Sequence, residues 1–193
     1  ALAALGAVDF LMWVVTGIST GLTKGFSIQL SQYYGAKDFE NLRKSLAHSY
    51  RLTAFIAAGV LILSQSFASL VLTGLHTPSN IIGMSLLYLR IIFCGIPATA
   101  AYNMFASALR AMGNSKTPLT AMIIASVLNV SLDILFVAGF GWGVAGAAIA
   151  TVIAQSFSAV YCFLILRRID IVHLTRADFM PDSGMNARLM KLG

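Results

Sequence analysis

Charged residues are scarce in this sequence. Only 13 Lys and Arg and 7 Asp and Glu occur among 193 residues, which is 10% of the chain. Soluble domains carry roughly 25% charged residues, so a soluble globule of this size could not be coated with charge. Hydrophobic residues make up 58% of the chain, and the mean hydropathy is +0.83. The composition therefore predicts an all-α, polytopic bundle of membrane helices.

The residues that build metal sites, disulfides and enzyme active sites are also few and scattered. The two cysteines, Cys94 and Cys162, fall in apolar stretches and are expected to act as small hydrophobes rather than as a disulfide. The three histidines lie far apart without ligand spacing. No catalytic triad, zinc-protease or phosphate-loop pattern occurs. We therefore predict that the protein is not an enzyme and carries no cofactor.

Long apolar runs, in contrast, dominate the chain. A spanning helix needs about 20 mostly apolar residues, and five segments reach that length: 2–32, 46–75, 81–109, 119–140 and 144–166. We expect residues 1–166 to form a bundle of five transmembrane helices. The polar and mixed residues 167–193 are expected to form a cytoplasmic linker.

The net charge of +6 comes from basic residues in alternate connections rather than in one patch, which argues against a nucleic-acid partner. Lys and Arg occur in the first and third connections and in the tail, whereas the second and fourth connections have none. The positive-inside rule places the basic connections in the cytoplasm. Five spans then put the N-terminus outside and the tail inside.

One acidic residue, Asp133, lies within the apolar run 119–140, with Asn129 one helical turn before it. A carboxylate in hydrocarbon costs on the order of 3 kcal/mol, and such residues usually mark ion or proton pathways. A structural hydrogen bond to a neighbouring helix is the simpler alternative. We favour a functional role for Asp133.

Thr151 is the expected partner of Asp133 across the turn centred on Trp142. Asp133 lies nine residues before Trp142 and Thr151 nine after it, so in an antiparallel hairpin both are expected level, roughly 13 Å from the turn at 1.5 Å per residue. Asp133, Asn129 and Thr151 offer hard oxygen ligands. The set could hold Na⁺, or the carboxylate could carry a proton.

Other polar residues repeat every three or four positions and so share helix faces, among them Asn103 and Gln155. Membrane helices also pack through such residues, but several such faces in one short chain favour a shared polar cavity. Lys24 either snorkels to the interface or faces that cavity, and Arg90 is either a buried pair partner or a gate charge. Pro97 is expected to kink its helix.

Several motifs resemble those of the multidrug and toxic compound extrusion (MATE) transporters, in that family's order and spacing. They are Ser31-Gln32-Tyr33-Tyr34-Gly35-Ala36-Lys37-Asp38, Tyr88-Leu89-Arg90-Ile91, Ala111-Met112-Gly113-Asn114-Ser115-Lys116-Thr117-Pro118, Asn129-Val130-Ser131-Leu132-Asp133 and Gly143-Val144-Ala145-Gly146-Ala147-Ala148-Ile149-Ala150-Thr151.

The resemblance implies a plasma (bacterial inner) membrane antiporter with two six-helix lobes, which exports cationic or amphipathic compounds in exchange for Na⁺ or H⁺. It also implies a cation-coupling role for the positions of Asn129, Asp133 and Thr151. The chain resembles helices two to six of the N-terminal lobe. The family's first helix, which carries another acidic ligand, and its second lobe have no counterpart in this sequence and are the expected partners.

Two alternatives remain at this stage. A flippase for lipid-linked precursors or polysaccharides would have a related fold and a basic cavity, for which Lys24 and Arg90 are the only candidates. A non-transporting membrane scaffold would tolerate Leu at position 133.

Overall fold

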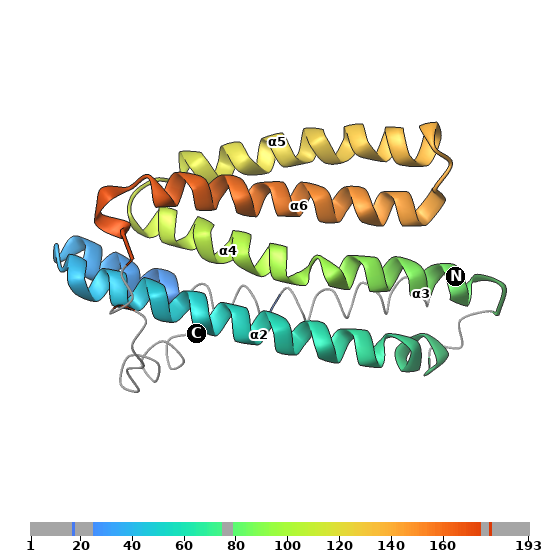
Figure 1. The fold of residues 1–193 in the computed structure, drawn as a ribbon, viewed down its shortest axis with the longest axis horizontal. Coiled ribbons are helices and arrows are strands. Elements are labelled where there is room, and N and C mark those ends of the chain that lie inside the picture. Colours follow the sequence, from blue (N-terminus) through green and yellow to red (C-terminus); the bar gives the residue numbers. More distant parts are fainter. Residues whose placement is uncertain (1–16, 18–24, 75–78, 175–177, 179–193) are drawn as a thin grey trace.

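A computed structural model describes residue 17 and residues 25–74, 79–174 and 178. Every regular element in these ranges is helical, which confirms the all-α expectation. A helical stretch over residues 25–35 precedes the named elements. These are α2 (Phe39–Gly74), α3 (Ser79–Cys94), α4 (Ile96–Ala111), α5 (Lys116–Asp133), the π-helix η1 (Ile134–Gly139), α6 (Gly143–Arg167) and the 3₁₀-helix η2 (Asp170–Val172) (Figure 1).

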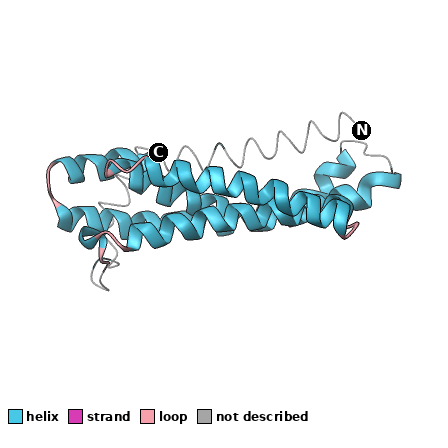
Figure 2. Ribbon diagram, turned by 90° about the horizontal axis from the view of Figure 1, so that it is seen from above, coloured by secondary structure: helices cyan, strands magenta, loops and turns pink. Residues whose placement is uncertain are grey.

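Four stretches within the described ranges are long and apolar enough to cross a membrane: Phe39–Gly74, Ile81–Ala111, Lys116–Gly139 and Gly143–Arg167. They agree with four of the predicted spans. Most of the predicted span 2–32 lies outside the described residues. The helices run along one long axis with the connecting loops at its two ends (Figure 2), as a set of membrane-crossing helices requires.

Helix α6 lies between α5 and α4 and also contacts α3 (Figure 1). Its buried positions are mostly small residues: Gly146, Ala148, Ala150, Ala154, Ser158, Ala159, Cys162 and Leu166. Membrane helices associate through such residues because small side chains let two backbones approach closely. Helix α6 is therefore the central packing element among the described helices.

The third predicted span is interrupted at the expected proline. Helix α3 ends at Cys94, Gly95 forms a turn, and α4 begins at Ile96 with Pro97 in its first turn. Proline has no N–H to donate and its ring opposes a continuous helix. A Cβ on Gly95 would lie 3.0 Å from Gln155 Oε1 and 3.0 Å from Val152 Cγ2, so the break packs tightly against α6.

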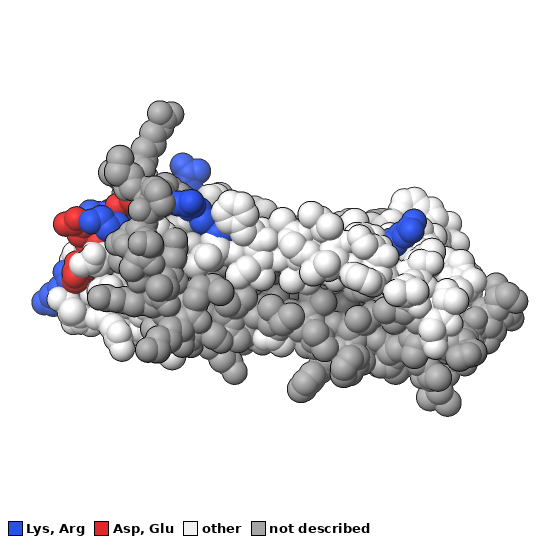
Figure 3. All heavy atoms as spheres, turned by 90° about the horizontal axis from the view of Figure 1, so that it is seen from below, with Lys and Arg blue, Asp and Glu red and all other residues white. Residues whose placement is uncertain are grey.

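Basic and acidic side chains gather at one end of the molecule (Figure 3). At this charged end Asp38 caps α2: the backbone N–H of Asn41 donates to Asp38 Oδ1 at 3.2 Å, and the Asn41 side-chain amide donates to Oδ2 at 2.7 Å. These two hydrogen bonds favour the ionised form and hold the pKa of the Asp38 carboxyl below its usual value.

We expect Asp38→Ala to loosen the first turn of α2, because the substitution removes an N-cap acceptor. Amide hydrogen exchange in residues 39–42 should become faster. Since the carboxyl pKa is lowered in the folded protein, the wild-type cap should hold at neutral pH and fail as pH falls through that lowered pKa. Asp38→Asn is the matched control, because Asn also caps well but should remove the pH dependence. Equal exchange in wild type and Asp38→Ala would contradict this.

Candidate functional site

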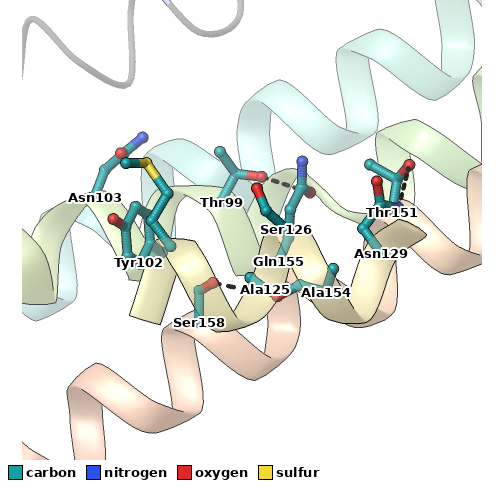
Figure 4. Close-up of a pocket in the computed structure, with 11 residues that line it drawn as sticks. Thr99, Tyr102, Asn103, Ala125, Ser126, Asn129, Thr151, Ala154, Gln155 and Ser158 are labelled. Carbon is teal, nitrogen blue, oxygen red and sulfur yellow. Dashed lines mark hydrogen bonds between the residues drawn. The ribbon is translucent and has the colours of Figure 1, made fainter. Parts of the chain in front are cut away.

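A cavity of about 320 Å³ lies between α4, α5 and α6 (Figure 4). Helix α4 contributes Thr99, Tyr102 and Asn103. The remaining lining residues come from α5 and α6 and are Met122, Ala125, Ser126, Asn129, Thr151, Ala154, Gln155 and Ser158. Eight of these eleven residues carry a polar side-chain group, which is unusual for a cavity lined by apolar helices.

Two hydrogen bonds join side chains that line this cavity from different helices. The Asn129 side-chain amide donates to Thr151 Oγ1 at 3.4 Å, which links α5 to α6. Thr99 Oγ1 donates to Gln155 Oε1 at 2.8 Å, which links α4 to α6. Figure 4 shows both pairs pointing toward one another from separate helices. Thr151 and Gln155 are one turn apart on α6, so the two links form one polar ridge.

Asp133 is the last residue of α5, one turn from Asn129 and directly before the π-helix. Its Oδ1 atom is buried and has no hydrogen-bond partner among the residues that the structure describes. Burying a polar atom without a partner is costly, and burying a charge without one costs more. No group in the described part of the chain offsets the burial of this oxygen atom.

The structure pairs Thr151 with Asn129, one turn before Asp133, although the residue count expected Thr151 level with Asp133 itself. A six-residue π-helix, for which the residue count made no allowance, lies between Asp133 and the turn. A π-helix bonds i to i+5, so it is wider than an α-helix and advances less per residue. The N–H groups of Phe140 and Trp142 donate to the carbonyls of Leu135 and Phe136, both at 2.9 Å.

The other predicted site residues fall in different places. Asn103 and Gln155 line the cavity as expected. Arg90 is exposed on α3 and is not among the residues that line the cavity; its role as a pair partner or a gate charge stays a prediction. Lys24 lies outside the described residues.

Sequence reasoning missed Tyr102, which lines the cavity and donates a hydrogen bond from its hydroxyl to the Pro118 carbonyl at 3.2 Å. It also missed the π-helix. Tyr102 lies next to Asn103 and one turn after Thr99 on an expected polar face, and that position was the signal that could have identified it.

Comparison with known proteins identifies relatives of the whole chain. The family model described as MatE matches residues 1–135. YoeA, a probable multidrug resistance protein of Bacillus subtilis, is 32% identical over 201 residues, which cover 100% of this chain and 43% of YoeA. The multidrug export protein MepA of Staphylococcus aureus is 22% identical, with 93% of this chain and 40% of MepA covered.

Solved structures show the same fold. An inward-facing multidrug resistance MATE family transporter matches with a TM-score of 0.90 at 24% identity, covering 100% of this chain and 44% of that one. An outward-facing conformation matches with a TM-score of 0.89 at 24% identity, covering 98% and 43%. The chain thus spans less than half the length of the relatives that it matches, and it belongs to the MATE (MatE) family of membrane transporters.

Proposed function

We propose that this chain forms part of a secondary antiporter that exports cationic or amphipathic compounds in exchange for Na⁺ or H⁺. The observation that carries the proposal is the Oδ1 atom of Asp133, which is buried in a stretch apolar enough to span a membrane and has no hydrogen-bond partner among the described residues. The cavity lined by Asn129 and Thr151 begins one turn away. The names of YoeA and MepA, a probable multidrug resistance protein and a multidrug export protein, support this class of activity.

In the proposed coupling site Asp133 supplies the exchangeable negative charge, and Asn129 and Thr151 supply neutral oxygens. In the Asn129–Thr151 hydrogen bond the side-chain nitrogen of Asn129 is the donor. The side-chain carbonyl oxygen of Asn129 takes no part in that bond and could bind a cation. Carbonyl, hydroxyl and carboxylate oxygens are the hard ligands that Na⁺ requires. A proton would need only the carboxylate.

Coupling then requires that the cation bind one conformation of the transporter better than the other. A ligand shifts a conformational equilibrium only by its differential affinity for the two states. Because Asn129 and Thr151 belong to different helices, relative movement of α5 and α6 would change their separation and hence the affinity of the site. Organic substrate would occupy the cavity bounded by Asn103 and Gln155.

We further propose that the charged end, with the connections after residue 35 and before α5, faces the cytoplasm of a bacterial inner membrane. The basic residues of these connections support that orientation under the positive-inside rule. Residues 1–166 would then form five helices of one transporter lobe, and residues 167–193 would form a cytoplasmic linker to the second lobe.

Efflux of ethidium from vesicles containing the full-length protein tests the proposal. An inward Na⁺ gradient or an inward proton gradient should accelerate efflux, and removing the gradient should return it to the rate of empty vesicles. Whichever gradient is effective identifies the coupling ion. An efflux rate that depends on neither gradient would contradict antiport. Binding of lipid-linked precursors without binding of cationic dyes would favour the flippase alternative.

A further inference from the structure

A second cavity, of about 360 Å³, lies between α2 and α4 with one wall from α6. It uses a different face of α4 from the first cavity: Pro97 and Phe105 line the second, whereas Thr99 and Asn103 line the first. The lining is almost wholly apolar, and several of its residues are alanines. Ala54 and Ala58 are exposed, so this cavity is a groove open to the surroundings. We name it the α2–α4 groove.

The groove has the length of one lipid leaflet. Its α2 wall runs from Tyr50 to Leu61, which is roughly 16 Å at 1.5 Å per residue. Half of a hydrocarbon core is about 15 Å. The α6 wall is Phe163, one turn before the end of α6 at Arg167. The groove therefore lies in the half of the membrane next to the charged end.

Aromatic side chains form the end of the groove nearest the charged end. Tyr50 meets Phe105 edge-on with ring centroids 5.5 Å apart, and Phe105 lies 5.3 Å from Phe163. The guanidinium of Arg167 lies 5.9 Å from the centroid of the Phe163 ring. Arg167 is itself exposed. An apolar groove thus ends beside an accessible cation.

We propose that the α2–α4 groove binds an acyl chain of an acidic phospholipid, with the lipid phosphate at Arg167. The groove is apolar and about as long as an acyl chain. The Arg167 guanidinium carries the opposite charge to a phosphate and can donate two parallel hydrogen bonds to it. A peptide would have to leave backbone groups without partners in this apolar lining, at a cost that an acyl chain does not have. The lipid comes from the leaflet that faces the charged end.

Native mass spectrometry of the full-length protein in detergent tests the proposal with phosphatidylglycerol and phosphatidylcholine of identical chains. Wild type should retain phosphatidylglycerol in preference to phosphatidylcholine. Arg167→Gln should lower that preference roughly fivefold, the ratio that corresponds to about 1 kcal/mol per basic residue near anionic lipid. Arg168→Gln, at the same end but without the ring contact, is the matched control and should change it less.

Ala58→Phe should fill the groove and reduce retention of both lipids. Ile62→Phe is its control, because Ile62 is 65% exposed on the same helix and does not line the groove. Equal retention of the two lipids by wild type, or unchanged retention in Arg167→Gln, would overturn the proposal. Because Arg167→Gln leaves the helix packing intact, it decides the matter even if Ala58→Phe fails to fold. The readout is lipid binding, so it is independent of efflux.

Discussion

Replacing Asp133 by Asn in the full-length protein is expected to reduce gradient-driven efflux to background while the amount of folded protein stays the same. Asn has nearly the same volume as Asp but cannot become negatively charged. It therefore can neither release a proton nor neutralise a bound Na⁺. The measurement is ethidium efflux under the effective gradient, normalised to protein in the membrane.

The same substitution should keep or raise thermal stability. A carboxylate in hydrocarbon costs on the order of 3 kcal/mol, and Asp133 Oδ1 has no partner within the described part of the chain to offset that cost. Loss of function with equal or greater stability is the signature of a residue kept for activity. A lower melting temperature in detergent would instead indicate that Asp133 makes a structural hydrogen bond.

Ser131→Ala is the matched control for Asp133→Asn. Ser131 lies two residues away on α5, is exposed, and its hydroxyl donates to the Val127 carbonyl of its own helix at 2.8 Å. Its removal should leave efflux close to the wild-type rate. Asp133→Glu retains the charge and should retain part of the coupling. Unchanged efflux in Asp133→Asn would exclude Asp133 as the exchangeable carboxylate.

Gly146→Ala should destabilise the hairpin that holds the site, with the second largest effect that we expect. A Cβ at position 146 would lie 2.9 Å from Phe136 Cβ, 3.1 Å from Trp142 Cβ and 3.2 Å from the Phe136 carbonyl carbon. These atoms belong to, or lie next to, the backbone and cannot move aside as a flexible side-chain end would. Such overpacking typically costs about 1–3 kcal/mol.

The displaced segment would carry Thr151, five residues further along α6, away from Asn129. Gly146→Ala should therefore lower both the melting temperature and the coupled efflux. Gly139→Ala in the same hairpin is the control, since a Cβ there would meet only Leu135 Cδ1, at an ordinary 3.6 Å. If both variants have the same melting temperature as wild type, the close approach of α6 to the π-helix is not important for stability.

Composition and periodicity were enough to predict most of the fold. An excess of apolar residues in runs of about 20 leaves few alternatives to membrane helices, because backbone groups in lipid must be satisfied within each segment. The four described spans and the interruption near Pro97 follow from this rule and from the missing N–H of proline. The glycines between α5 and α6 likewise indicated a tight turn. Gly141 and Gly143 adopt positive φ values of 69° and 54°, which glycine reaches without strain.

The candidate site was only partly predictable. Helical spacing placed Asn129 and Asp133 one turn apart, and Gln155 one turn after Thr151, since side chains at i and i+4 share a face. Which residue of α5 lies opposite Thr151 of α6 was not predictable to the same degree. The count assumed a constant rise per residue, and the π-helix Ile134–Gly139 changes that rise. No periodic pattern in these apolar residues distinguishes i+5 from i+4 bonding.

The sequence by itself determined that this chain is a bundle of membrane helices with a costly carboxylate at Asp133. Local composition decides whether a segment lies in lipid or in water, and residue spacing decides which side chains share a helix face. Only the tertiary structure decided that Asn129 pairs with Thr151, that Arg90 does not line the cavity, and that a second, apolar groove ends beside Arg167. Each of these depends on how separate helices are rotated and shifted against each other. The rotation and shift of the helices depend on how their whole surfaces pack together, and the sequence of one helix does not determine that packing.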